Sequence, residues 1–353
     1  MEGIFLDYYD PLFGIIIFVL IIFIASFLTY SYNIYKEKQA RSEYKELLER
    51  FGIGSLDEQD YVHLYKTFNL PFDSIMLLAS SFALKGDYNK SISIYLTLLE
   101  HVQDRVKKEE LLEILGTTYF KGGFLKRSAD IFLTILEFAP RNLNALKYLL
   151  LSYEKLKEWD KALDVLESLN ELNIDIKEEK TYIIIQKIIN DPLLSYDKKT
   201  SKIIQIFEFM PSIARIVAQY LLIYNKTLFW EKLENFDIGD IVDLLWYLDF
   251  NDVDFDHISQ NPTLKTIYYA KGYITNENQA SFSIELDILS KLALYDKELR
   301  SKVDLGFDFV CKKCKKTYPM YEARCPHCHS ILSFKVKPKL IKRMNIEENL
   351  SLQ

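Results

Sequence analysis

The hydrophobic residues fall into one uninterrupted block near the start of the chain and into amphipathic segments after it. Residues 12–30 read LFGIIIFVLIIFIASFLTY, and no charge occurs from Pro11 to Tyr35. Because about 20 apolar helical residues cross the core of a bilayer, the block predicts a transmembrane helix over residues 12–31. We expect residues 1–11 to form a short external tail and residues 32–72 a juxtamembrane helical linker.

A cleaved signal peptide and a buried core helix are the other readings of this block. A signal peptide begins with basic residues and ends at a cleavage site made of small residues. Here the leader contains Glu2, Asp7 and Asp10 but no Lys or Arg, and no A-x-A sequence follows the apolar block. The sequence therefore favours a helix that stays in the protein as a membrane anchor.

The charges on the two sides of the block predict its orientation. The charged residues before it are all acidic, whereas four basic residues follow it closely, at Lys36, Lys38, Arg41 and Lys45. The positive-inside rule then places the N-terminus outside and everything after residue 32 in the cytoplasm. Because the cytoplasm is reducing, we expect the four cysteines of the chain not to form disulfides.

A pattern of four positions recurs over residues 73–175. Each repeat begins with an aromatic residue. A turn residue follows four positions later, a small residue nine positions later and a bulky residue thirteen positions later. Two units also have a small residue three positions before the aromatic, at Ala79 and Gly116. The pattern resembles the tetratricopeptide repeat (TPR), in which small residues let paired helices approach closely. The three sets are Phe82, Gly86, Ser91 and Tyr95; Tyr119, Gly123, Ser128 and Phe132; and Tyr153, Lys157, Ala162 and Leu166.

Residues 176–305 are helical in character but have no clear repeat. Their segments are amphipathic or strongly apolar, and Gly and Pro are scarce in the chain, at 11 and 9 residues. We interpret this region as degenerate TPR-like helices, with Trp230, Trp246 and Tyr247 packing between helices rather than binding a ligand. The expected fold class is all-α: an N-terminal transmembrane helix, a TPR-like α-solenoid and a small C-terminal rubredoxin-like or zinc-ribbon metal domain.

An α-solenoid offers a concave surface that binds peptides or helices. The chain contains no P-loop, G-x-G-x-x-G, H-E-x-x-H or G-x-S-x-G motif, so we expect a protein that is not an enzyme and has no catalytic residues. The net charge of −6 does not indicate nucleic-acid binding. The solenoid therefore predicts protein partners.

All four cysteines lie near the C-terminus, in two C-x-x-C pairs separated by ten residues. The spacing predicts one tetrathiolate metal ion, iron or zinc, in a domain over residues 306–336. We do not expect His327 or His329 to be ligands, because four sulfurs already complete a closed structural site. The predicted ligands are Cys311, Cys314, Cys325 and Cys328.

Residues 337–353 are expected to form a basic tail. Lys337, Lys339, Lys342 and Arg343 lie in it, and Lys335 directly precedes it. We interpret these charges as solvated, because runs of charge usually are solvated. Contact with the anionic leaflet of a membrane is the alternative.

The order of these parts resembles the lipopolysaccharide assembly protein B family. The resemblance rests on CKKC at residues 311–314 and CPHC at residues 325–328, together with the anchor and its orientation. It implies a bacterial inner-membrane protein with a periplasmic N-terminus and a rubredoxin-like domain packed against TPR units. It also implies an adaptor that regulates lipopolysaccharide biosynthesis through proteolysis, by presenting the lipid A deacetylase to a membrane ATP-dependent protease.

Two positions depart from electron-transfer rubredoxins. In those proteins Gly usually follows the second cysteine of each pair, where the backbone favours φ > 0, but here Lys315 and His329 follow. We therefore expect the metal to be structural. A rubredoxin-like redox protein and a generic TPR scaffold for another inner-membrane complex are the alternatives.

Overall fold

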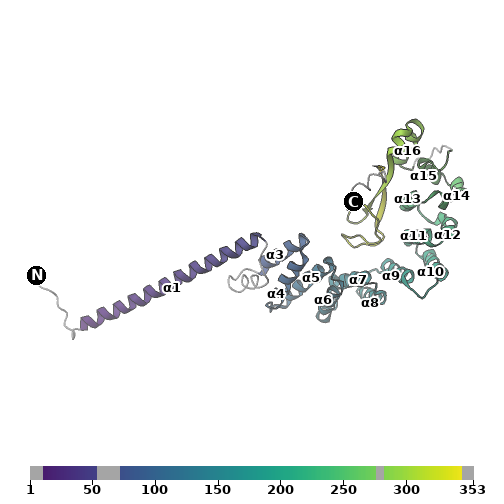
Figure 1. Ribbon diagram of the computed structural model, residues 1–353. Helices are drawn as coiled ribbons and strands as arrows, with labels where there is room; N and C mark the ends of the chain where they lie inside the picture. The colour runs from purple at the N-terminus through teal and green to yellow at the C-terminus, as the bar shows by residue number, and fades with distance from the viewer. Residues whose placement is uncertain (1–10, 54–71, 276–281, 344–353) are drawn as a thin grey trace. The chain divides into compact units, whose positions relative to one another are not determined.

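The computed structural model describes residues 11–53, 72–275 and 282–343 (Figure 1). The chain divides into two compact units, residues 1–152 and residues 153–353, and each unit is described by itself. The expected external tail up to residue 10, part of the expected linker and the end of the expected basic tail lie outside the described residues.

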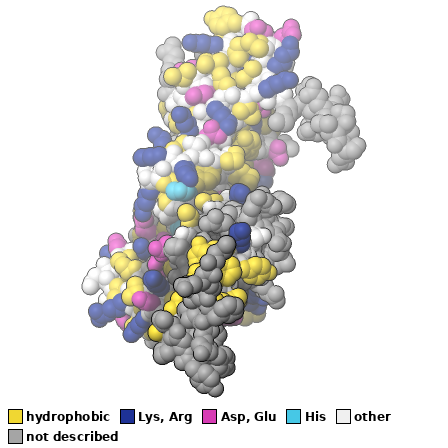
Figure 2. Space-filling view, turned by 90° about the vertical axis from the view of Figure 1, so that its left-hand side faces the viewer, with side chains coloured by type: hydrophobic (Ala, Val, Ile, Leu, Met, Phe, Trp, Pro, Cys, Tyr) yellow, Lys and Arg dark blue, Asp and Glu magenta, His cyan; other side chains and the backbone are white. Residues whose placement is uncertain are grey.

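Helix α1 (Pro11–Ile53) contains the apolar block. Its stretch Ile17–Lys36 is long and apolar enough to cross a membrane, and none of it is buried inside the protein. At a rise of 1.5 Å per residue, twenty residues cover about 30 Å, the thickness of a bilayer core. Phe18, Phe23 and Leu28 are among its many exposed apolar side chains. In Figure 2, hydrophobic side chains (yellow) gather in the lower part of the face shown, among grey atoms.

Beyond α1, the described residues of the first unit form packed helices. Helix α3 (Phe72–Leu84) packs against α4 (Tyr88–Leu99), and α5 (Arg105–Lys121) packs against α6 (Leu125–Phe138). Helix α4 also packs against α5, so the two pairs stack on each other. Helix α7 (Leu143–Leu156) follows. This stacking is how a solenoid buries a continuous core.

The turn position has the same left-handed backbone in all three repeats. Gly86, Gly123 and Lys157 have φ values of +85°, +80° and +59°. The N–H of the next residue donates to the carbonyl of the repeat's aromatic residue, over 3.0, 2.9 and 2.9 Å. A left-handed residue with this bond is a common way to end a helix, and Gly adopts it without steric cost. Lys157 makes the same turn with a Cβ.

The small position of the repeat lies where two helices meet. Ser91, Ser128 and Ala162 are fully buried. In the second repeat, the Ser128 hydroxyl donates to the carbonyl of Gly116 over 2.9 Å. A Cβ on Gly116 would lie 2.8 Å from the ring of Phe132. The helices α5 and α6 are therefore as close as a glycine permits.

The second unit continues with helices that pack in order. Helix α8 packs on α9 and α9 on α10, and α11, α13 and α15 then pack on one another in turn. Trp230 and Trp246 are buried, as expected for packing residues. The helices are α8 (Trp159–Glu171), α9 (Lys177–Asn190), α10 (Tyr196–Phe209), α11 (Ala214–Tyr224), α12 (Lys226–Glu231), α13 (Ile238–Trp246), α14 (Phe255–Gln260), α15 (Pro262–Lys271), α16 (Ile284–Tyr295) and α17 (Lys297–Lys302).

The chain ends, within the described residues, in a small antiparallel sheet of order β2-β1-β3. Its strands are β1 (Val303–Cys311), β2 (Thr317–Tyr318) and β3 (Phe334–Lys342). Strand β1 pairs with β3 from Val303↔Lys342 to Cys311↔Phe334. In Figure 1 the sheet (yellow-green) lies beside α13 and α16, both of which pack on it. The all-α solenoid with a small cysteine-containing domain is confirmed.

The sheet extends beyond the expected metal domain at both ends. We expected this domain over residues 306–336 and a basic tail after it, but β1 begins at Val303 and β3 ends at Lys342. The difference arises because lysines alternate with Val336, Pro338 and Leu340 in β3. This alternation has the period of a strand, which the high charge hides in the sequence.

Gly116→Ala is expected to lower the midpoint of thermal unfolding, followed by circular dichroism in detergent. Phe132 is fully buried and stacked on Tyr148, so its ring cannot move away from the added Cβ. Overpacking of this kind costs about 1–3 kcal/mol, against about 1 kcal/mol gained by replacing a helical Gly. Lys121→Ala, at an exposed position of the same helix, is the control. A Gly116→Ala midpoint at or above that of the wild type would contradict the close packing.

Candidate metal centre

The two C-x-x-C pairs fold into two turns with matching hydrogen bonds. In each turn the N–H four residues after the first cysteine donates to that cysteine's carbonyl over 2.9 Å. The first cysteine's own N–H donates to the carbonyl five residues later, over 3.0 Å in one turn and 2.9 Å in the other. Each pair of sulfurs is thus held by a closed backbone turn. The residues are Cys311, Lys315 and Lys316 in the first turn, and Cys325, His329 and Ser330 in the second.

The residue after the second cysteine of each turn is left-handed. Lys315 has φ +62° and His329 has φ +58°. These are the positions at which the sequence suggested a backbone suited to Gly. A left-handed conformation costs an L-residue roughly 1–2 kcal/mol, so the surrounding hydrogen bonds must stabilise each turn against this cost.

The turns bring all four cysteine sulfurs together. The Sγ atoms lie within 4.8 Å of one another, with 3.6 Å between Cys311 and Cys328 and 3.7 Å between Cys314 and Cys325. No disulfide joins any of the four. A tetrahedral ion with metal–sulfur bonds of about 2.3 Å needs sulfurs about 3.8 Å apart. The arrangement fits a tetrathiolate ion and can bind a metal, and iron and zinc both suit four thiolates.

Polar neighbours shift the proton affinity of the thiols. Burial raises the pKa of Cys311, but hydrogen bonds from the Ser333 hydroxyl and the Cys314 N–H outweigh it and lower the pKa to about 5. At Cys314 an N–H from Lys316 lowers the pKa, but desolvation and the other thiols raise it overall to about 11. The Cys311 sulfur is therefore ready to bind a cation at neutral pH, whereas Cys314 must first lose a proton.

The histidines lie outside this group of ligand atoms. His327 is exposed, and neither it nor His329 belongs to the set of side chains whose ligand atoms converge. Cys328 is the exposed member of the four, whereas Cys311 and Cys325 are buried. Metal ligation by the four cysteines alone is therefore the arrangement that the geometry favours.

Arg324, directly before the third cysteine, connects this domain to the helices. Its guanidinium donates to Glu154 in α7 over 2.8 Å and to Glu179 in α9 over 3.1 and 2.7 Å. It also donates to the His329 carbonyl over 2.7 Å. The carboxylate of Glu154 in turn accepts the Tyr182 hydroxyl over 3.0 Å. The second cysteine turn is thus fixed to two helices of the solenoid.

The electrostatics of this cluster favour the charged form of Arg324. Burial lowers its pKa, but the hydrogen bonds and charges of Glu179 and Glu154 outweigh burial and raise it. Burial, and then the charge of Glu154, raise the pKa of Tyr182. The guanidinium therefore stays positive and the phenol neutral at physiological pH.

A second arginine holds the other side of the domain. Arg215 in α11 forms a two-pronged ion pair with Asp243 in α13, over 2.8 and 2.6 Å. Its guanidinium carbon lies 3.9 Å from the ring centre of Tyr321 and 5.6 Å from that of Phe309. Burial raises the pKa of Tyr321 to about 12. A desolvated guanidinium over an aromatic face is a strong form of the cation–π contact.

Another contact of the sheet with the helices is apolar. Tyr247 was expected to pack between helices, but its side chain is 67% exposed and lies edge-on to Phe307 of β1, with ring centres 5.7 Å apart. Sequence reasoning did not identify the arginines or their carboxylates, because the partners come from distant segments and follow no motif. The one available signal was an arginine directly before a predicted metal ligand.

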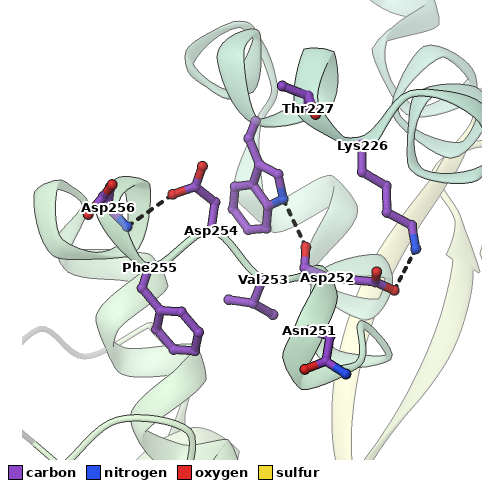
Figure 3. A pocket seen from close by; sticks show the side chains of 9 residues that line it. Lys226, Thr227, Asn251, Asp252, Val253, Asp254, Phe255 and Asp256 are labelled. Carbon is purple, nitrogen blue, oxygen red and sulfur yellow. Dashed lines mark hydrogen bonds and ion pairs between the residues drawn. The ribbon is translucent and has the colours of Figure 1, made fainter.

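A polar cleft of about 500 Å³ lies elsewhere in the second unit (Figure 3). Asp252 pairs with Lys226, and its carbonyl accepts the Trp230 N–H over 3.0 Å. Asp254 accepts N–H groups from the first turn of α14, including that of Asp256 over 3.0 Å. These groups pair with one another and cap a helix, so we assign no chemistry to the cleft.

Comparisons with known proteins show a local similarity. The chain is 31% identical over 101 residues to lipopolysaccharide assembly protein B of Escherichia coli K12, and equally to those of strains CFT073 and O157:H7. The aligned segment covers 28% of this chain and only 26% of those relatives. No protein-family model matches the chain. BtubC (BKLC) from P. vanneervenii matches over 70% of this chain and 96% of its own, with 16% identity and a TM-score of 0.26, too low to carry an argument.

Cys311→Ser is expected to reduce the bound metal from about one ion per chain to a small fraction, because a neutral hydroxyl replaces a thiolate in a closed site. His327→Ala, in the same turn as Cys328, should keep the full amount. Elemental analysis of the purified full-length proteins measures both. Loss of metal from His327→Ala would show that the histidine is a ligand.

Arg324→Ala is expected to lower the free energy of unfolding by about 3 kcal/mol, because two largely buried carboxylates lose their partner. Chemical denaturation of the full-length protein measures the change. Lys187→Ala removes the exposed ion pair with Asp160 and should cost less than about 1 kcal/mol. Equal effects of the two substitutions would contradict the role assigned to Arg324.

Proposed function

We propose that this protein is a membrane-anchored, non-enzymatic adaptor that acts in lipopolysaccharide assembly. The observation that carries the proposal is the order of parts along one chain: an apolar helix able to span a membrane, a helical solenoid, and a four-cysteine domain docked on that solenoid. The local similarity to lipopolysaccharide assembly protein B supports the same reading.

The four cysteines Cys311, Cys314, Cys325 and Cys328 would hold one iron or zinc ion in this proposal. When bound, the ion supplies four metal–sulfur bonds that join the two turns. The protein's own residues then fix the joined turns to the helices, through Arg324 on one side and through Tyr321 on Arg215 on the other. The role is structural: the metal keeps a partner-binding array of helices and strands in one shape.

The proposed partners of the solenoid are two proteins of lipid A synthesis and its control. With the N-terminus in the periplasm and the bulk in the cytoplasm, the solenoid would present the lipid A deacetylase to an ATP-dependent protease of the inner membrane. The basic residues Lys36 and Lys38 after the apolar stretch support this orientation. A concave helical surface suits the binding of such protein partners.

Depletion of the protein in a bacterium that makes lipid A is expected to raise the level of the lipid A deacetylase several-fold, measured by immunoblot. Complementation with His327→Ala should restore the low level, and Cys311→Ser should not, because it removes one ligand of the metal that holds the docked domain. An unchanged deacetylase level after depletion would exclude this client.

Crosslinking in membranes followed by pull-down separates the proposal from a generic scaffold. Recovery of the protease or the deacetylase supports the adaptor, and recovery of unrelated membrane machinery supports a scaffold for another complex. A purified protein with reversible iron absorbance changes would instead support the redox alternative.

A further inference from the structure

The domain built on β1, β2 and β3 differs sharply in charge from the rest of the chain. Residues 303–343 contain eight lysines and two arginines but only three carboxylates, whereas the whole chain has a net charge of −6. A basic domain on an acidic protein indicates a surface with an anionic partner.

The sheet has two unlike faces. In β3, Phe334 and Val336 are buried, whereas Lys335 and Lys337 between and after them are exposed. The buried face continues through Phe307 of β1, which packs on Tyr247. Lys335 and Lys337 therefore point away from the helices, at alternate positions about 7 Å apart.

The lysines of the first cysteine turn extend this surface. Lys312, Lys313, Lys315 and Lys316 are all exposed. The N–H of Lys312 donates to the Ser333 carbonyl over 2.6 Å, which places the turn beside the start of β3. We call the resulting surface the basic face, and it consists of Lys312, Lys313, Lys315, Lys316, Lys335 and Lys337.

The basic face keeps most of its positive charge within the part of the chain that the structure describes, although Asp308 lies opposite Lys337 in the strand register. Arg324 is bound to Glu154 and Glu179, and Lys339 pairs with Asp308. Arg343 pairs with Asp304. For the six lysines of the basic face, the described residues provide no ion-pair partner, so their charge is available to an external anion.

We propose that the basic face docks on the anionic lipid headgroups of the membrane that holds α1. This inference rests on the membrane anchoring in the proposed function, because the anchor keeps the domain at a high local concentration near the bilayer. A surface of several lysines without a shaped pocket fits the diffuse charge of a leaflet, to which each basic residue adds attraction within a Debye length.

Nucleic acid fits this surface less well. Proteins that bind single strands stack bases on aromatic side chains, and specific readers of duplexes use the two-pronged geometry of Arg. On the basic face the charges are lysines, and the aromatic residues of the sheet, such as Phe307 and Phe309, are buried on the opposite face. Both arginines of the domain are engaged with carboxylates.

The test uses the full-length protein in lipid nanodiscs. One set contains phosphatidylcholine alone, and the other contains about one third phosphatidylglycerol, comparable to an anionic leaflet. Co-elution of the protein with the discs first tests the anchor. Acetylation rates of individual lysines, measured by mass spectrometry, then report the contact of each side chain.

Acetylation of Lys312, Lys313, Lys335 and Lys337 is expected to be at least about threefold slower in the anionic discs, and NaCl at about 0.5 M should abolish the difference. Lys198 and Lys202, exposed on α10, should react equally in both sets. Lys335→Glu with Lys337→Glu should remove the protection of Lys312 and Lys313. The matched variant Lys198→Glu with Lys202→Glu should keep it.

Equal rates in the two sets of discs would overturn the docking and leave the anchor and the adaptor function standing. Protection that is as strong in neutral discs would also overturn it. A protein that fails to enter the discs would contradict the anchor, and the inference with it. If duplex RNA at the same charge concentration protects the basic face in neutral discs more strongly than anionic lipid does, the surface belongs to nucleic acid.

Discussion

The contact of one guanidinium with two carboxylates determines where the last part of the chain lies. Arg324, Glu154 and Glu179 are all largely buried, so separating them would leave charges without partners in a poorly solvated site. The planar guanidinium can serve both carboxylates and a backbone carbonyl at once, which a lysine cannot do with the same geometry.

The small sheet depends on two kinds of stabilisation that act on different parts of it. A domain of about 40 residues buries too little apolar surface to be stable alone. At one end, the cysteine turns can gain folding free energy from a metal ion. Along its inner face, the sheet packs on α13 and α16, so the solenoid supplies part of its core. The left-handed Lys315 and His329 are tolerated within this framework.

The features that were predictable from the sequence are local ones. The apolar helix, the repeated turns and the four clustered cysteines each depend on residues within a few dozen positions. The left-handed Lys157 even confirms a repeat position where glycine is absent. The contact of Arg324 with Glu154 could not be predicted, because the partners are 170 residues apart and follow no periodicity. The length of β3 was missed because its alternating lysines have the composition of a solvated tail.

The contact of Arg324, in the second cysteine turn, with α7 and α9 changes how the helices between them can unfold. A solenoid usually loses repeats from its ends, since each repeat contacts only its neighbours. Here Arg324 closes a loop of 170 residues through a non-covalent contact. Closing such a loop costs on the order of 4 kcal/mol in chain entropy. The contact compensates for this cost only when the helices within the loop are all folded. The helices between α7 and the cysteine turns should therefore be lost together rather than fray one pair at a time.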